Sequence, residues 1–309
     1  MSVRVFIDGA VGTTGIDIQD RLAPRGDITL VTLAEDRRKD AEARRGALTD
    51  ADIAILCLPD DAAREAVALI GDGATRVIDA STAHRVATGW VYGFPELEAD
   101  QAAKIADARF VANPGCYPTA FLALVRPLVR AGLVPADWPL SFAATSGYSG
   151  GGKTMIAEFE QGRTDTAFRA YALGLAHKHA PEMRGHAGLT HPPIFAPSVA
   201  RVYSGMLGEV PLPLYALPGR PTIAAIEDCL RGAYADSALI GVAPCDGGAI
   251  RIEENAGTDR MTLRVCGNDA AGQARLVATL DNLGKGAGGA AVQNLNLMAG
   301  LDPLAGLNL

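Results

Sequence analysis

Residues 3–22, VRVFIDGAVGTTGIDIQDRL, carry the pattern that decides the fold of this chain. Val3–Ile7 is predicted as a strand and Gly15–Leu22 as a helix, with a glycine-rich turn between them. Glycines here let the backbone turn tightly and approach a pyrophosphate, which then lies against N–H groups at the helix N-terminus. The turn has one residue more than the G-x-G-x-x-G fingerprint, so a plain strand-to-helix turn is the alternative. The residues expected to contact a dinucleotide are Gly9, Gly12, Thr13, Thr14 and Gly15.

The same alternation of strands and helices continues to about residue 115. Further strands are predicted at Ile28–Leu33, Ile53–Leu58, Arg76–Asp79 and Arg109–Ala112, and a helix at Ala62–Ile70. Apolar strands joined by helices indicate a parallel sheet that is covered on both faces. We therefore expect an α/β, Rossmann-type doubly wound sheet with its ligand crevice at the carboxyl ends of the strands.

The pattern changes after about residue 117. Trp138–Phe142, Ile194–Tyr203 and Arg260–Val265 are predicted as longer strands of a mixed sheet, in a second, α+β domain for catalysis and oligomerisation. The chain ends with a glycine-rich turn and an apolar helix, GKGAGGAAVQNLNLM, which should fold back onto the first domain. The expected division is 1–115 with 284–309 for the dinucleotide and 116–283 for catalysis.

Composition excludes several classes of protein. Hydrophobic residues make up 49% of the 309 residues and charged residues 20%, as in ordinary soluble globular proteins. No apolar run reaches the roughly 18 residues of a membrane span, and no signal-peptide layout is present, so a cytoplasmic protein is expected. The net charge of −7 argues against a nucleic-acid surface. Five cysteines without a CxxC pair argue against a disulfide framework and for a reducing compartment.

The residues after the second strand bear on the choice between NAD and NADP. An acid there usually binds the ribose 2′-OH, whereas a nearby arginine accommodates a 2′-phosphate. Glu35 and Asp36 favour NAD, and the following Arg37 and Arg38 favour NADP. We expect NADP(H) because a planar guanidinium suits a phosphate, although a solvated basic surface is the alternative.

The segment Asn113-Pro-Gly-Cys116-Tyr-Pro-Thr119 contains the candidate nucleophile. A tight turn follows a strand, and an apolar helix is predicted from about Pro118 to Arg130. Cys116 therefore lies at the N-terminus of this helix, where the helix dipole stabilises a thiolate. A thiolate at the carboxyl end of a Rossmann strand is suited to aldehyde or acyl chemistry. The other four cysteines lack such a setting and are expected to be structural.

Several longer motifs resemble one known family. GAVGTTG, DASTAHR, VYGFPEL, NPGCYPT, TSGYSGGGK, HKHAPEM and AVQNLNLM are similar to segments of N-acetyl-gamma-glutamyl-phosphate reductases of the shorter form. These enzymes belong with the aspartate-semialdehyde dehydrogenase superfamily, and the resemblance covers essentially the whole chain. It implies NADPH-dependent reduction of an acyl phosphate, N-acetyl-L-glutamyl 5-phosphate, to the semialdehyde through a cysteine thioester in arginine biosynthesis. It also implies a homodimer or homotetramer.

The resemblance assigns roles to individual residues. Cys116 matches the nucleophile and His177 the general acid/base, while Arg85 matches an arginine that holds phosphate. Further substrate-pocket positions are Tyr171, His179 and Glu182, and further cofactor positions are Ser146, Gly147 and Asn294. The pair His177 and His179 could ligate zinc, but no further ligands stand at a suitable spacing, so no metal is expected.

Two other functions compete with this one. The first is a related enzyme, an aspartate-semialdehyde dehydrogenase, a glyceraldehyde-phosphate dehydrogenase or another acyl-phosphate reductase. The HKHAPE and NPGCYPT segments argue against the first two of these. The second is a non-catalytic Rossmann protein that senses the redox state of a dinucleotide. A sensor would have no reason to place a cysteine at a helix N-terminus beside a histidine motif.

Overall fold

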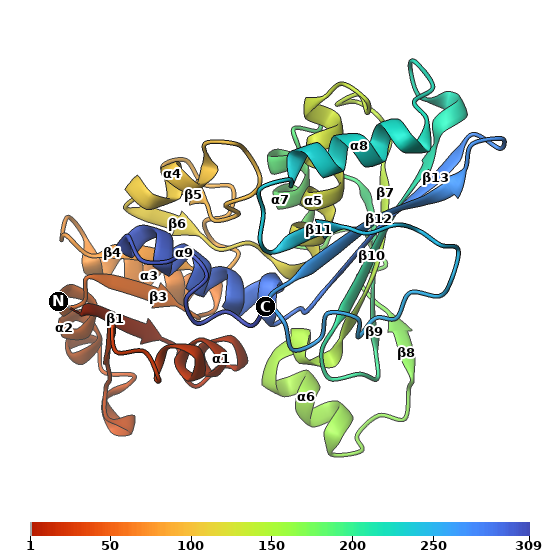
Figure 1. Ribbon diagram of the computed structural model, residues 1–309. Helices are drawn as coiled ribbons and strands as arrows, with labels where there is room; N and C mark the ends of the chain where they lie inside the picture. Colours follow the sequence, from red (N-terminus) through yellow and green to blue (C-terminus); the bar gives the residue numbers. More distant parts are fainter. Residues whose placement is uncertain (1) are drawn as a thin grey trace. The chain divides into compact units, whose positions relative to one another are not determined.

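The computed structural model describes residues 2–309, which fall into two units (Figure 1). Unit 1 comprises the residues up to Gly115 together with Ala287–Leu307. Unit 2 comprises Cys116–Gly286 with Asn308–Leu309. Since Gly115 and Cys116 are neighbours in sequence, the boundary falls inside the NPGCYPT segment.

Unit 1 is built on a six-stranded parallel sheet with the strand order β2-β1-β3-β4-β6-β5. The strands are β1 (Val3–Asp8), β2 (Ile28–Val31), β3 (Ile53–Leu56), β4 (Arg76–Asp79), β5 (Val91–Tyr92) and β6 (Phe110–Ala112). Strand order reverses at β1, because β2 lies on one side of it and all later strands lie on the other. This is the doubly wound arrangement expected from the sequence, and it places a ligand crevice at the carboxyl ends of the strands.

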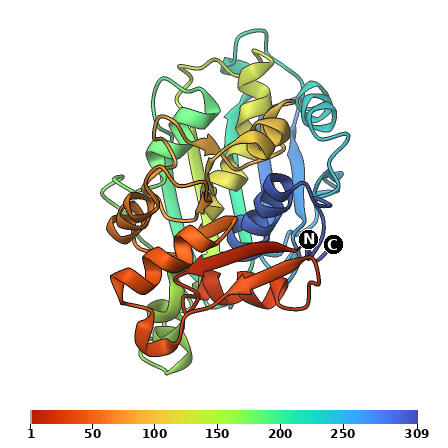
Figure 2. The same ribbon diagram turned by 90° about the vertical axis from the view of Figure 1, so that its left-hand side faces the viewer.

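Alternate residues of each strand in unit 1 pack against different helices. Val5 and Ile7 of β1 belong to a core with α1 (Thr13–Leu22), α4 (Gln101–Asp107) and α9 (Gly289–Ala299). Phe6, between them, belongs to a core with α2 (Ala41–Asp50) and α3 (Asp60–Ile70). Both faces of the sheet are therefore covered (Figure 2), as the two-residue period of a strand requires.

Unit 2 is built on a seven-stranded mixed sheet with the strand order β11-β12-β13-β10-β7-β9-β8. Its strands are β7 (Ser141–Gly147), β8 (Phe168–Ala170), β9 (Ile194–Ala200), β10 (Met206–Pro213), β11 (Ile240–Val242), β12 (Met261–Asn268) and β13 (Gln273–Leu280). The pairs β7–β9 and β11–β12 are parallel, and the remaining pairs are antiparallel. The mixed sheet confirms the expected second architecture.

Helices cover one face of this sheet. The helices of unit 2 are α5 (Cys116–Arg130), α6 (Gly152–Glu160), α7 (Ala180–Ala187) and α8 (Ile223–Ala233). The central one, α5, contacts β10, β13, α7 and α8 and is buried along most of its length. Opposite-facing residues such as Ile194 of β9 are exposed, so this face of the sheet is open in a single chain.

One expectation about the cysteines is wrong. Cys245, in the loop after β11, forms a disulfide with Cys266 of β12. The two are 21 residues apart in sequence, and only the return of the chain along β12 brings them together. Within residues 2–309, no helix is long and apolar enough to cross a membrane.

Candidate active site

The glycine loop of unit 1 connects β1 to α1 and requires glycine at two positions. Gly9 has a φ of +89°, and a Cβ there would lie 2.3 Å from the carbonyl oxygen of Cys57. A Cβ at Gly15 would lie 2.5 Å from the carbonyl oxygen of Gly9. Gly12 is different, because its φ is −73° and its Cβ would meet no atom closer than 3.4 Å. A Cβ at Gly12 would therefore make only ordinary contacts with the protein, so the protein itself does not require glycine there.

The N-terminus of α1 fits the pyrophosphate of a dinucleotide. Gly12 is the N-cap residue, so no side chain caps the first N–H groups of the helix. The buried Thr13 hydroxyl oxygen has no hydrogen-bond partner among the described residues. Uncapped N–H groups and an unsatisfied hydroxyl are what an anion at a helix N-terminus would engage. Thr14 follows in the first turn.

A buried ion pair that sequence reasoning missed fixes the base of this loop. Asp8, the last residue of β1, accepts hydrogen bonds from Nε and Nη2 of Arg44 on α2, at 3.2 and 2.9 Å. Both side chains are almost fully buried, and Arg44 also lies 3.4 Å from Glu65. The signal in the sequence was a single acid at the end of an otherwise apolar strand, directly before the first glycine.

The basic residues after β2 lie on the surface. Glu35, Asp36 and Arg37 form a short 3-10 helix, and Arg38 follows it. All four are exposed, and the Arg37 guanidinium lies 3.6 Å from Asp40. This corner presents acids and arginines to solvent together, so the geometry allows either ribose or phosphate recognition.

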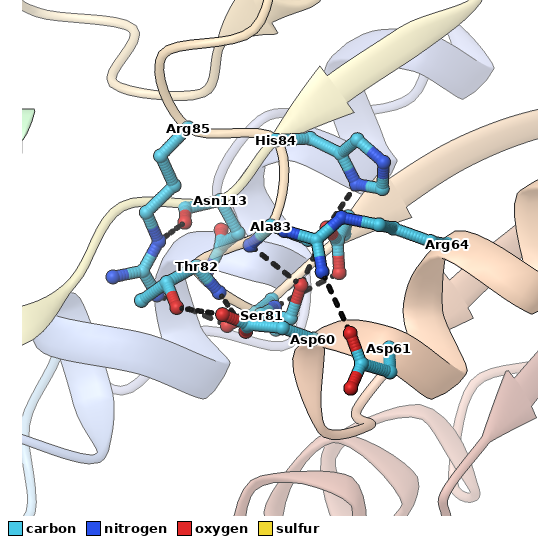
Figure 3. A network of polar contacts seen from close by, with 11 residues as sticks. Asp60, Asp61, Arg64, Ser81, Thr82, Ala83, His84, Arg85 and Asn113 are labelled. Atoms are coloured by element: carbon cyan, nitrogen blue, oxygen red, sulfur yellow. Dashed lines mark hydrogen bonds and ion pairs between the residues drawn. The ribbon is translucent and has the colours of Figure 1, made fainter. Parts of the chain in front are cut away.

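The loop after β4 is held by two carboxylates, Asp79 and Asp60, and Figure 3 shows the contact of Asp60 with Thr82. Asp79, the last residue of β4, accepts hydrogen bonds from the backbone N–H and the hydroxyl of Ser81, at 2.9 and 2.7 Å. It also lies 2.6 Å from Nδ1 of His84, whose ring stacks on Trp90. Thr82 binds Asp60 of α3 through its N–H and its hydroxyl, at 3.0 and 2.6 Å. The loop is therefore anchored at three of its residues, Ser81, Thr82 and His84.

This anchored loop ends at Arg85, the expected phosphate ligand. The guanidinium donates from Nε to the carbonyl oxygen of Asn113, at 2.9 Å, and from Nη2 to that of Ala80, at 3.0 Å (Figure 3). The side chain is buried, so its charge is only partly screened by water. A guanidinium fixed by backbone carbonyls is suited to anion recognition because its orientation is set before a ligand binds.

Asn294 of α9 lies within unit 1 as a buried link between two segments. Its Nδ2 donates to the carbonyl oxygen of Gly93, at 2.9 Å, and to Oδ1 of Asn113, at 3.0 Å. Its own Oδ1 is buried and has no partner in the part of the chain that the structure describes. An unsatisfied amide oxygen can accept one hydrogen bond from a ligand such as a carboxamide.

In unit 2, Cys116 is the first residue of α5, two residues before the helix start expected from sequence. The residue is half-buried. The chain also passes close by at Gly286, where a Cβ would lie 2.8 Å from the Cβ of Cys116. The helix N-terminus favours the thiolate over the thiol at this position.

The other thiols are in unsuitable environments. Burial raises the pKa of the Cys57 thiol to about 12, and the charges of Asp79, Asp8 and Asp17 add to this. Burial also raises the pKa of Cys229. Both residues therefore stay protonated near neutral pH, which leaves Cys116 as the candidate nucleophile.

The HKHAPE segment places His177 just before α7 in a defined tautomer. The backbone N–H of His179 donates to Nδ1 of His177, at 3.1 Å, so the neutral ring carries its hydrogen on Nε2. Burial lowers the pKa of His177, and the charge of Lys178 lowers it further, whereas Glu182 opposes the shift. The ring is therefore neutral at pH 7 and offers a hydrogen-bond donor at Nε2.

Aromatic rings surround His177. Tyr117, next to Cys116 on α5, lies edge-on to the His177 ring with centroids 6.1 Å apart, and the Tyr171 ring lies 5.8 Å away. Burial raises the pKa of Tyr117 well above its ordinary value and that of Tyr171 to about 12, and in both cases the charge of Cys116 contributes. Both phenols therefore keep their hydrogens near neutral pH.

The other residues of unit 2 that the sequence assigned to the site lie at the start of α7 or at the end of β7. His179 is the N-cap residue of α7 and Glu182 is in its first turn, and both are buried. The buried Ser146 and Gly147 end β7, where the Gly147 N–H donates to the carbonyl oxygen of Gly205, at 2.8 Å. A Cβ at Gly147 would lie 2.6 Å from the carbonyl oxygen of Tyr203, so this close passage requires glycine.

The chain between Tyr171 and His177 is strained. Ala172 and Leu175 have φ values of +52° and +57°, a region that residues with a side chain seldom occupy. The N–H of Leu175 donates to the carbonyl oxygen of Ala172, at 3.0 Å, which closes a tight turn. Strain of this kind is common where a backbone must present functional side chains. Sequence reasoning did not anticipate it.

Family models match both units. The model described as "Semialdehyde dehydrogenase, NAD binding domain" covers residues 4–105, and "Semialdehyde dehydrogenase, dimerisation domain" covers residues 116–282. Together with the doubly wound sheet and the cysteine at a helix N-terminus, they define the chain as a semialdehyde dehydrogenase-type oxidoreductase that binds a pyridine nucleotide.

Relatives of similar length narrow this class. N-acetyl-gamma-glutamyl-phosphate reductase 2 of Nostoc sp. is 48% identical over 98% of this chain and 99% of its own. N-acetyl-gamma-glutamyl-phosphate reductase of Brucella anthropi is 51% identical over 97% of this chain and 99% of its own. The chain therefore belongs to the N-acetyl-gamma-glutamyl-phosphate reductase family.

Solved structures agree on the fold. Aspartate semialdehyde dehydrogenase II from Vibrio cholerae, in a crystal structure complexed with ASA, has a TM-score of 0.73 at 16% identity. The alignment covers 97% of this chain and 98% of that chain. The enzyme from Francisella tularensis has a TM-score of 0.74 at 14% identity and covers 96% of this chain. At such identities the likeness concerns the fold alone.

Proposed function

We propose that this chain reduces N-acetyl-L-glutamyl 5-phosphate to N-acetyl-L-glutamate 5-semialdehyde and phosphate, with NADPH as reductant, in arginine biosynthesis. The observation that carries the proposal is the identity of about half of all residues to reductases of that name over nearly the full length. The cluster of Cys116, His177 and Tyr171 in unit 2 supports it, since this set can perform acyl transfer to sulfur.

The covalent step uses Cys116. Its thiolate sulfur attacks the acyl carbon and forms a C–S bond, while the carbonyl π electrons move to oxygen. When the oxyanion collapses, the C–O bond to phosphorus breaks and phosphate leaves with that electron pair, so a thioester remains on the sulfur. Hydride addition to the thioester carbonyl gives a thiohemiacetal anion, which releases the aldehyde as the C–S bond breaks and its electron pair returns to sulfur as the thiolate.

His177 stabilises the oxygen on which negative charge develops. Its Nδ1 accepts a hydrogen bond from the backbone N–H of His179, so the neutral ring presents Nε2–H to the carbonyl oxygen of the substrate. The lowered pKa keeps this tautomer at neutral pH. The ring acts as a fixed hydrogen-bond donor to this oxygen during attack, reduction and collapse, and it keeps its Nε2 hydrogen throughout.

The cofactor belongs to unit 1. Gly9, Gly12 and Gly15 form the turn for the pyrophosphate, and the hydroxyl of Thr13 and the amide oxygen of Asn294 are available to the bound nucleotide. When bound, the reduced nicotinamide supplies the hydride. Arg37 and Arg38 favour a 2′-phosphate, because two exposed guanidinium groups suit a dianionic group, and this supports NADPH over NADH.

We assign Arg85 to the phosphate of the substrate and Tyr171, His179 and Glu182 to the substrate pocket. The buried, oriented guanidinium of Arg85 supports the first assignment. A homodimer or homotetramer is proposed as the working form. It is supported by the dimerisation-domain match and by the open face of the sheet in unit 2.

The test runs the reaction in reverse, because acyl phosphates are unstable. Purified protein should oxidise N-acetylglutamate 5-semialdehyde with NADP only when phosphate or arsenate is present. Aspartate 4-semialdehyde should be used about a hundredfold less efficiently in kcat/KM, since the groups that bind the acetamide would be left unpaired. If aspartate semialdehyde proves the better substrate, the proposed activity is wrong, although the cysteine chemistry would survive.

A further inference from the structure

Two tyrosine hydroxyls beside the candidate nucleophile form a directed chain of hydrogen bonds. Tyr117 donates to the carbonyl oxygen of Ser198, at 3.0 Å, and Tyr171 donates to the hydroxyl of Tyr117, at 3.2 Å. Ser198 is fixed in β9, where it pairs with Thr145 of β7 and with Ala170 of β8. The chain of hydrogen bonds therefore starts from a rigid point of the sheet.

The direction of both hydrogen bonds follows from the carbonyl oxygen of Ser198, at which the chain of bonds ends. A carbonyl oxygen can only accept, so the single hydrogen of the Tyr117 hydroxyl is committed to Ser198. Tyr117 then has only lone pairs to offer Tyr171, so Tyr171 must donate its own single hydrogen to Tyr117. The raised pKa values of both phenols keep both hydrogens in place near neutral pH.

Tyr171 is consequently left as a hydrogen-bond acceptor. Its hydroxyl has no further hydrogen bond within residues 2–309, and its backbone N–H is held by the carbonyl oxygen of Pro197, at 3.1 Å. The Tyr171 hydroxyl is bonded to the hydroxyl of Tyr117, the residue that follows Cys116, and the Tyr171 ring centroid lies 5.8 Å from that of His177. An acceptor oxygen thus lies close to the place where an acyl group would be bound.

We propose that Tyr117 is a positioning residue that locks the Tyr171 hydroxyl as an acceptor, and that Tyr171 thereby selects substrates carrying an N–H donor near the reacting acyl group. The inference rests on the proposed function and names the group of the substrate that this residue reads. The chemical class is an N-acylated amino acid bound through its amide N–H, with the amide carbonyl directed elsewhere.

The polarity of this contact discriminates between related substrates. In N-acetylglutamyl phosphate the amide nitrogen is four bonds from the acyl carbon, and its N–H can meet a neutral oxygen without any charge to compensate. A free ammonium would also donate, but a neutral phenol leaves its buried charge uncompensated. If an ester oxygen replaced the N–H, its lone pairs would face those of the Tyr171 hydroxyl, because Tyr171 has no hydrogen left to give.

The experiment compares N-acetylglutamate 5-semialdehyde with its ester analogue, in which oxygen replaces the amide N–H. Wild-type enzyme, assayed with NADP and phosphate, should prefer the amide by about tenfold or more in kcat/KM. In Tyr117→Phe the hydrogen of Tyr171 is released and can turn toward the ester oxygen, so the preference should fall to within about threefold of unity. Tyr171→Phe should lose the preference as well.

Tyr234→Phe is the matched control, because Tyr234 also donates to a backbone carbonyl, that of Ala123 on α5, at 2.9 Å. It should keep the wild-type preference. For any variant too slow to assay, calorimetric binding of N-acetylglutamate and its acetoxy counterpart gives the same ratio, and thermal melting with NADPH titration verifies the fold.

Equal use of amide and ester by the wild type would overturn the inference. So would a Tyr117→Phe enzyme that keeps the wild-type preference, since a merely structural tyrosine would leave the ratio unchanged. In either case oxidation of the amide substrate would leave the proposed function standing. Failure of the wild type to oxidise that substrate would refute the proposed function instead.

Discussion

Replacing Gly12 with alanine adds one methyl group to the mouth of the glycine loop. The new Cβ would lie 3.4 Å from the carbonyl oxygen of Gly9 and 3.9 Å from that of Cys57, which are ordinary contacts. The φ of −73° is open to any residue. Because alanine is a poorer N-cap than glycine, the free energy of unfolding should fall by at most about 1 kcal/mol. The protein should therefore stay folded.

Cofactor binding should suffer far more than stability in this variant. The methyl group would stand where a pyrophosphate approaches the uncapped N–H groups of α1. Each charged hydrogen bond that is lost costs about 1.5–3 kcal/mol. The dissociation constant for NADPH, followed by its fluorescence, should therefore rise about ten- to a hundredfold.

Two further glycine variants separate binding from folding. Gly9→Ala should lower the melting temperature, because a φ of +89° and a carbonyl oxygen 2.3 Å from the new Cβ force the backbone to move. Gly46→Ala on α2, where nothing lies within 4 Å, should leave NADPH affinity unchanged. A stable Gly12→Ala protein with wild-type NADPH affinity would refute the placement of the pyrophosphate at this loop.

Three other predictions concern charge and strain. Replacing Arg37 and Arg38 together with alanine should weaken NADPH at least about tenfold and NADH little; equal kcat/KM for the two cofactors in the wild type would contradict this. Because burial lowers the pKa of His177 below its ordinary value of about 6.5, kcat/KM should stay level as the pH falls to about 6.5 and decline only below it. A decline of kcat/KM that already begins above about pH 7 would contradict its origin in His177, and His177→Asn should abolish the decline. Ala172→Gly should relieve the φ of +52° and raise the free energy of unfolding by up to about 1 kcal/mol in urea titrations; a less stable variant would show that no strain is stored there.

The sequence predicts unit 1 well wherever strands are buried on both faces. A continuous apolar run such as β3, which is fully buried, is visible without any partner. By contrast, α2 was missed because its sequence, AEARRGALTD, shows a weak apolar stripe. The two-residue strand β5 is too short to show a period. Such elements form because their neighbours in the fold hold them.

In unit 2, local sequence preference is a poor guide to where the strands lie. The strand expected at Trp138–Phe142 is in fact β7, which starts at Ser141 and continues through small polar residues to Gly147. Pro211 and Pro213 lie within β10, although proline normally argues against an interior strand. Both prolines lie beyond the stretch Met206–Glu209 that pairs with β7, where β10 has β13 as its only neighbour, so this part of the strand tolerates proline as an edge does.

The site could be predicted where its signal is local. The turn before Cys116 and the helix after it are contiguous in sequence, and so is the histidine segment. The partners of these residues come from distant parts of the chain: Arg44 for Asp8, Ser198 for Tyr117 and Cys266 for Cys245. Neither residue spacing nor composition encodes such contacts, since they depend on which strands become neighbours.

Cys116 is expected to carry the acyl group covalently, and trapping that group on the enzyme measures this role. The enzyme is mixed with N-acetylglutamate 5-semialdehyde and NADP in the absence of phosphate, and the protein is then analysed by mass spectrometry. We expect a burst of about one NADPH per chain and one N-acetylglutamyl group on the peptide that contains Cys116, removed when phosphate is added. Cys116→Ser should show neither the burst nor the adduct while still binding NADPH. An adduct on another residue, or an undiminished burst in Cys116→Ser, would contradict the covalent role of Cys116.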